Sequence, residues 1–238
     1  MKKSTFLSLL SLFVLIPATL FLGSRLSGRQ YYITITLVII EVMLPFFVSF
    51  EARKPQPREL VTIAVMAALA AASRAVFAFL PSFKPITAII MITGMAFGAE
   101  AGFLTGALGI FASNFLFSQG PWTPWQMLAY GVAGFLAGLI FHRQASWRKP
   151  LVLGIFGFFY VLLLIGPLLD CCTIFTSLTK ITWPAVGLVF AQGLVPNLLH
   201  AAATGLTLLL FSKPLLGKLR RLQVKYGMIG LEEEAEHL

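Results

Sequence analysis

The chain has 238 residues, of which 58% are hydrophobic and 11% are charged, whereas soluble proteins carry about 25% charged residues. This composition excludes a soluble protein and predicts an integral protein of the lipid bilayer. Lys and Arg number 18 against 9 Asp and Glu, but runs of about twenty apolar residues separate these charges. The basic excess therefore indicates membrane topology rather than a nucleic-acid partner.

Two apolar runs, 5–23 and 31–50, open the chain. The first follows Lys2 and Lys3, exceeds the about 7 to 15 residues of a signal-peptide core, and has no clear cleavage site. We interpret it as a retained transmembrane helix, with a cleaved signal peptide as the alternative. Glu41 in the second run is expected to face protein, since a carboxylate in lipid is costly. We place these two helices in a first unit, 1–50, and a basic, proline-containing cytoplasmic linker at 51–59.

Run 60–80 is rich in alanine. The alanines recur every four residues along two adjoining faces: Ala64, Ala68 and Ala72 on one, Ala67, Ala71 and Ala75 on the other. Small residues at this spacing let helices approach closely in a membrane. The pattern fits either packing within this chain or docking of another subunit.

Run 86–117 is too long for one crossing of the membrane and short for two. Near its middle, the sequence from Gly98 to Gly102 contains Glu100 between glycines and predicts a turn. With a break there, the chain crosses eight times and most Lys and Arg residues fall on the side of both termini. The positive-inside rule then makes that side cytoplasmic.

The remaining predicted spans are 125–141, 151–169 and 184–211, with an external loop at 170–183. After residue 211 we expect a cytoplasmic tail, 212–238, that is first basic and then acidic. Such a tail is typically solvated, and its basic part is expected to lie on anionic headgroups.

Catalytic and metal-binding patterns are missing from the sequence. It contains no Walker A loop, no His-Glu-x-x-His, no Gly-x-Ser-x-Gly and, before the acidic end of the tail, no paired acidic residues at helical spacing. The adjacent Cys171 and Cys172 do not have metal-ligand spacing. We expect neither an enzyme nor a bound cofactor or metal, and no ATP hydrolysis by this chain.

The predicted topology instead gathers polar and aromatic side chains toward the outer face. Each alone is typical of a satisfied structural group or an interfacial aromatic, but together they predict a substrate-binding site. Its candidate residues are Arg74, Phe83, Lys84, Asn114, Gln119, Trp122, Trp125, Gln126, Tyr130, Asp170, Asn197 and His200. Trp122, Trp125 and Phe83, together with Pro121 and Pro124, are expected to form a rigid apolar lid over a pocket.

Residues 60–211 resemble the substrate-binding S component of energy-coupling factor (ECF) transporters, a family of prokaryotic vitamin importers. The resemblance lies in the alanine-rich helix 64–78, the turn at 82–88, the glycine-containing 102–107, and the segment from Ser113 to Gln126, which occur in this order. It implies a six-helix, all-α core in the plasma membrane, to which the two N-terminal helices are additional. It also implies a vitamin ligand near the outer surface, held under the loops after the first and third core helices.

The same resemblance implies partners. The alanine face of the first core helix would pack on a transmembrane coupling subunit, itself bound to two ATPase subunits. We assign this interface to Ala64, Ala68 and Ala72, with Ala67, Ala71 and Ala75 as the alternative register. The motifs are most similar to members associated with cobalamin, and a riboflavin-like ligand or a queuosine precursor is the alternative. A membrane scaffold without transport function is the competing class.

Overall fold

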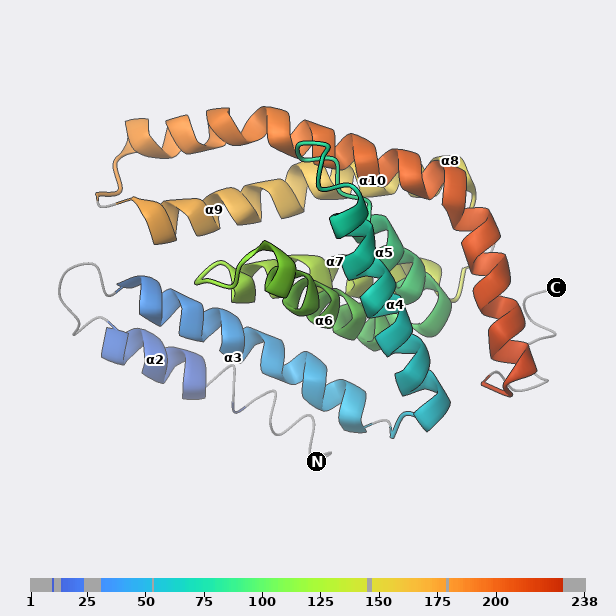
Figure 1. Cartoon of the computed structure of the whole chain (residues 1–238). Helices are drawn as coiled ribbons and strands as arrows, with labels where there is room; N and C mark the ends of the chain where they lie inside the picture. Colours follow the sequence, from blue (N-terminus) through green and yellow to red (C-terminus); the bar gives the residue numbers. More distant parts are fainter. Residues whose placement is uncertain are drawn as a thin grey trace.

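The computed structural model describes residues 10, 14–23, 31–52, 54–144, 147–178 and 180–228 (Figure 1). Most of the first half of the predicted span 5–23, the loop that follows it and the acidic end of the tail lie outside these residues.

Within this part of the chain every regular element is a helix. The elements are α2 (Ile16–Gly23), α3 (Tyr31–Ala52), α4 (Pro57–Val76), α5 (Ile86–Phe97), α6 (Ala99–Phe117), α7 (Thr123–Phe141), α8 (Pro150–Tyr160), the π-helical η4 (Val161–Ile165), α9 (Gly166–Ser177) and α10 (Trp183–Lys225). The helices α8, η4 and α9 form one continuous stretch.

Six of the described helical stretches are long and apolar enough to cross a membrane: α3, α4, α6, α7, the stretch from α8 to α9, and α10. This confirms the all-α membrane-protein class. Helix α5 has 12 residues and is about 18 Å long, less than the about 30 Å of a bilayer core. The number of eight spans stays a prediction.

The predicted break in run 86–117 is present, and it lies at one residue. Helix α5 ends at Phe97 and α6 begins at Ala99. Gly98 between them has a φ of 94°, a conformation that glycine adopts without the penalty of a side chain. The turn was expected to extend to Gly102, but residues 99–102 already form the first turn of α6.

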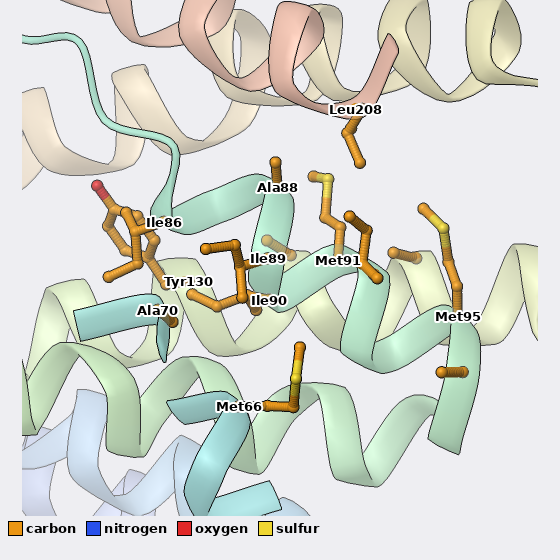
Figure 2. Packing of buried hydrophobic residues seen from close by; sticks show 14 of the residues in the cluster. Met66, Ala70, Ile86, Ala88, Ile89, Ile90, Met91, Met95, Tyr130 and Leu208 are labelled. Carbon is orange, nitrogen blue, oxygen red and sulfur yellow. The ribbon is translucent and has the colours of Figure 1, made fainter. Parts of the chain in front are cut away.

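Helix α5 is the centre of the core. All of its residues are buried, and it packs against α4, α6, α7 and α10. Figure 2 shows Met91 and Met95 of α5 with Met66 of α4 on one side and Leu208 of α10 on the other. A helix that is apolar all round is the kind that protein encloses on every side.

Glycines bring α5, α6 and α7 into backbone contact. A Cβ atom on Gly94 would lie 2.1 Å from the carbonyl oxygen of Gly134, and one on Gly102 would lie 2.3 Å from the same oxygen. Further along, a Cβ on Gly106 would lie 2.4 Å from the carbonyl oxygen of Tyr130. Close approach through small residues is a main source of helix association in membranes, and here it sets α6 and α7 side by side.

The N-terminal pair packs beside this core. Phe46 of α3 stacks on Phe103 of α6 at 4.1 Å between ring centres and meets Phe135 of α7 edge-on at 5.1 Å. On its other side, α3 faces α2, where Thr19 Oγ1 donates a hydrogen bond of 2.5 Å to Glu41 Oε1. Glu41 therefore faces protein, as expected for a carboxylate at membrane depth.

The predicted external loop 170–183 is wrong in its first part, because residues 170–177 belong to α9. The polar composition that indicated a loop is accommodated within the helix. Thr173 Oγ1 donates to the carbonyl of Leu169 at 3.2 Å, and Thr176 Oγ1 to that of Cys172 at 2.7 Å. Such hydrogen bonds to the preceding turn satisfy hydroxyls inside helices.

Helix α10 does not end at residue 211 but continues to Lys225, past Pro214. The first part of the predicted tail is thus helical and partly buried. Gln223 Nε2 donates 2.9 Å to the carbonyl of Ala96 at the end of α5, and the Arg58 guanidinium donates to the carbonyl of Tyr226. Figure 1 shows α10 running beside α9 and then bending before its C-terminal end, as expected where proline interrupts the backbone hydrogen bonds.

We call the end of the bundle that holds Arg74, where α4 and α6 finish and α7 and α10 begin, the Arg74 end. The opposite end holds the start of α4 and the finish of α7. There Arg148 Nε donates 2.8 Å to the carbonyl of Phe141 and its guanidinium also donates to the carbonyl of His142, closing the C-terminus of α7. Burial and the positive charge of Arg220 lower the pKa of Arg148.

Candidate functional site

Arg74, in the last turn of α4, reaches across to the end of α6. Its Nη1 donates to Ser113 Oγ and to Asn114 Oδ1, each at 2.8 Å. The guanidinium carbon lies 4.6 Å from the ring centre of Phe117, within the range of a cation–π interaction. Because a guanidinium stays protonated in proteins, these contacts hold a permanent positive charge at this end of the bundle.

Asn114 is the centre of the polar contacts around Arg74, and it is 1% exposed. Its Nδ2 donates to Thr123 Oγ1 at 3.1 Å and to Gln126 Oε1 at 2.9 Å, both on α7. The Thr123 hydroxyl donates in turn to Gln119 Oε1 at 2.9 Å. We call this set the Asn114 network; its members are Arg74, Ser113, Asn114, Gln119, Thr123 and Gln126. It joins α4, α6 and α7 at one level.

Lys84 lies beside this network, in the connection between α4 and α5. Its neighbour Phe83 packs on Phe77, three residues after Arg74, with 5.5 Å between ring centres. The Lys84 side chain is half-buried. Burial, and then the positive charge of Arg74, lower its pKa from the ordinary 10.5. The contact of Phe83 with Phe77 places Lys84 at the same end of the bundle as Arg74, so two cations lie at this end, both partly out of water.

His200, Thr87 and Tyr130 form a second set, the His200 group. His200 Nε2 and Thr87 Oγ1 are 2.8 Å apart, and the rings of His200 and Tyr130 stack with 5.8 Å between centres. Figure 2 shows Tyr130 beside Ile86 at the start of α5, with its hydroxyl pointing away from the methionines of the core. Tyr130 lies one helical turn after Gln126 on α7, so the group adjoins the Asn114 network.

Asp170 and Asn197 form a separate pair between α9 and α10. Asn197 Nδ2 donates to Asp170 Oδ2 at 2.9 Å. A Cβ on Gly193 would lie 2.4 Å from Asp170 Oδ1, and one on Gly166 would lie 2.6 Å from Asn197 Cγ. The two glycines therefore make room for the pair. The structure records no contact of the pair with the two cations, so these candidates occupy a different place from the rest.

The two tryptophans differ in their surroundings. Trp125 is 4% exposed and stacks on Phe175 of α9, with ring centres 5.9 Å apart. Its buried Nε1 has no acceptor among the residues that the structure describes. Trp122 is 39% exposed and lies against the backbone of Gly120. Trp125 thus packs between helices, whereas Pro121 and Trp122 of the predicted lid are exposed.

Sequence reasoning missed three hydroxyls of the site: Ser113, Thr123 and Thr87. Ser113 precedes Asn114 in an otherwise apolar run, and this Ser-Asn pair was the available signal. Thr123 lies between Trp122 and Pro124, where it looked like part of a turn. Each hydroxyl bonds a candidate side chain, so these residues orient the site.

The structure also separates the two alanine faces of α4. Ala67 and Ala71 are 5% and 8% exposed, and the backbone of Ala67 lies against Gly109 of α6. The other face is open, and its exposed residues are Val61, Ala64, Val65, Ala68, Leu69, Ala72 and Val76. The register of Ala67 and Ala71 is therefore used inside the chain, and the register of Ala64, Ala68 and Ala72 is available to a partner.

The structure is a membrane-type helical core with a cluster of polar side chains at one end, an arrangement suited to binding a small molecule. A family model described as the ECF-type riboflavin transporter S component matches residues 54–216, which contain every candidate residue, while α2 and α3 lie outside the match. The chain belongs to this family of ECF transporter S components. No curated protein and no solved structure was found to match it. Membership makes the chain a substrate-binding subunit rather than an enzyme, and one that works with an energy-coupling module.

Proposed function

We propose that this protein captures a vitamin at the outer face of a prokaryotic plasma membrane for ATP-driven uptake. The Arg74 end faces outward, as the loop charges favour, and both termini are cytoplasmic. The observation that carries the proposal is that the Asn114 network and the His200 group lie one helical turn apart on α7, at one end of the family-matched core. Polar side chains buried at membrane depth commonly line a ligand path.

The ligand is a vitamin with a large nitrogen-containing ring system, and there are two candidates. The family description favours a riboflavin-like molecule, and the likeness of the 82–126 segments favours cobalamin. Both would meet ring surfaces at Trp122 and Tyr130 and hydrogen-bonding groups at Gln126 and His200. A queuosine precursor is the remaining alternative.

Purification from cells grown with mixed vitamins, followed by mass spectrometry of the released ligand, tests this function. We expect one such vitamin to co-purify, and Asn114→Ala to lose it because the network that positions α6 against α7 is broken. Gln192→Ala is the matched control, since Gln192 is an amide exposed on α10. A protein that releases no vitamin and binds none that is added would instead be a scaffold.

The open alanine face of α4 is proposed as the docking surface for the transmembrane coupling subunit, which carries two ATPase subunits. The support is its exposure together with its small residues, which permit close approach of a second helix. Ala64, Ala68 and Ala72 would lie at the centre of that contact. Substrate release would then follow a rearrangement of this protein against its partner, driven by ATP binding in the ATPase subunits.

A further inference from the structure

The candidate site carries two positive charges without a compensating negative one. Arg74 bonds only neutral acceptors, Ser113 and Asn114, and Lys84 has no hydrogen-bond partner in the described part of the chain. No acidic side chain pairs with either cation there. Like charges held close together and partly out of water are costly unless a counter-charge is present.

The start of α5 adds to this positive charge. Helix α5 begins at Ile86, two residues after Lys84, and both Ile86 and Thr87 are fully buried. The first N–H groups of a helix have no partner inside it; here the N–H of Ala88 donates to the carbonyl of Pro85 at 3.0 Å, which leaves those of Ile86 and Thr87. The helix dipole places a partial positive charge at the same end. This buried N-terminus, Lys84 and Arg74 therefore create a positive potential in the same place.

The carboxylates that could neutralise it are engaged elsewhere. Asp170 accepts the hydrogen bond from Asn197, Glu41 accepts one from Thr19 on α2, and Glu100 lies beside Ser49, at 3.5 Å, near the opposite end of α6. The excess of positive charge around Arg74 and Lys84 is thus confined to the candidate site and does not extend through the core.

We infer that the substrate supplies the missing charge: it carries a phosphate or carboxylate group that binds between Arg74, Lys84 and the first turn of α5. This inference rests on the proposed function and narrows it to anionic members of the vitamin class. Hydrogen bonds between such a group and protonated Arg or Lys are short and strong, and a buried helix N-terminus adds N–H donors to the same anion.

A phospholipid headgroup offers the same chemistry, because Lys84 lies at the proposed outer surface of the membrane. The two sources are separable. A lipid phosphate would bind Lys84 only where phospholipid is present, whereas a substrate anion would bind in a detergent such as a maltoside, which contains no phosphate.

The test uses pairs of ligands that differ only by a phosphate group: riboflavin with riboflavin 5′-phosphate, and cobinamide with cobinamide phosphate. Binding is measured by calorimetry in maltoside for the wild-type full chain, Lys84→Met, Lys84→Arg and Lys180→Met. Lys180 is the matched control, because it is an exposed lysine in the connection that precedes α10. Lys84→Met removes no recorded hydrogen bond, so its folding should be preserved, and a thermal melt checks this.

We expect the wild type to bind the phosphate-bearing member of a pair about tenfold tighter or more, which is a moderate gain for a charge-assisted contact. Lys84→Met should abolish most of this preference, Lys84→Arg should retain it, and Lys180→Met should leave it unchanged. Equal affinities within a pair, or a preference that survives in Lys84→Met, would overturn the inference.

The remaining outcomes are also decisive. Binding of the uncharged ligands alone would leave the proposed function standing and refute the anionic group. Failure of all four ligands together with the absence of any co-purified vitamin would refute the function itself. If Lys84→Met changes only the phospholipid retained by the protein, measured as bound phosphorus in nanodiscs, the positive charge serves the lipid and the inference is wrong.

Discussion

Gly106 offers a direct test of how the candidate site is held. A Cβ atom there would lie 2.4 Å from the carbonyl oxygen of Tyr130 and 2.6 Å from its carbonyl carbon, whereas ordinary contact begins at 3.4 Å. Both atoms are backbone, so in Gly106→Ala the helices α6 and α7 must separate locally by about 1 Å. About two turns along, Asn114 Nδ2 and Gln126 Oε1 are 2.9 Å apart, and a shift of this size would exceed hydrogen-bonding distance.

We expect Gly106→Ala to lower the free energy of unfolding by about 1–3 kcal/mol, the usual cost of overpacking, and to weaken binding of the co-purified ligand. Thermal unfolding in maltoside and ligand titration measure the two effects. Gly187→Ala is the control, since a Cβ at that exposed position of α10 meets nothing within 4 Å. If Gly106→Ala melts and binds like the wild type, backbone contact between α6 and α7 does not position the site.

Three further changes test other parts of the molecule. Ala68→Leu should keep ligand binding but lose co-purification with the coupling subunit, whereas Ala67→Leu, buried against α6, should lower stability by about 1–3 kcal/mol; a transport-competent Ala68→Leu would contradict the proposed interface. His200→Ala should leave the Thr87 hydroxyl without its partner, at a cost of about 1–3 kcal/mol, and should weaken binding in the same titration; unchanged affinity would remove His200 from the site. Gln223→Leu should speed tryptic cleavage in the last turns of α10, and cleavage at the wild-type rate would show that its hydrogen bond does not anchor the helix.

Features that depend on local chemistry were predictable from the sequence. The membrane class follows from apolar runs, and the break at Gly98 follows from a glycine-flanked charge in a run that is too long for one crossing. Arg74, Asn114 and Gln126 were also identifiable, because long polar side chains are rare at membrane depth and need partners. The structure gives these three the shared hydrogen bonds of the Asn114 network.

Features that depend on contacts between distant helices were not predictable. Nothing in residues 212–225 by themselves indicates that Gln223 meets the end of α5. The predicted last helix therefore ended at residue 211, whereas α10 continues to Lys225. Asp170 looked like a loop residue because its partner, Asn197, is on another helix. The burial of Trp125 follows from the position of α9, and the choice between the two alanine faces follows from which one α6 covers.

The length of α10 has a practical consequence. The helix carries His200 near the Arg74 end and Gln223 at the opposite end, while the family match stops at residue 216. A chain that ends at residue 216, where the match ends, but keeps its N-terminal helices would retain every candidate site residue and lose the hydrogen bonds that Gln223 and Tyr226 make to α5 and α4. Weak expression or instability of such a shortened protein would therefore reflect the loss of these two hydrogen bonds, not damage to the candidate site.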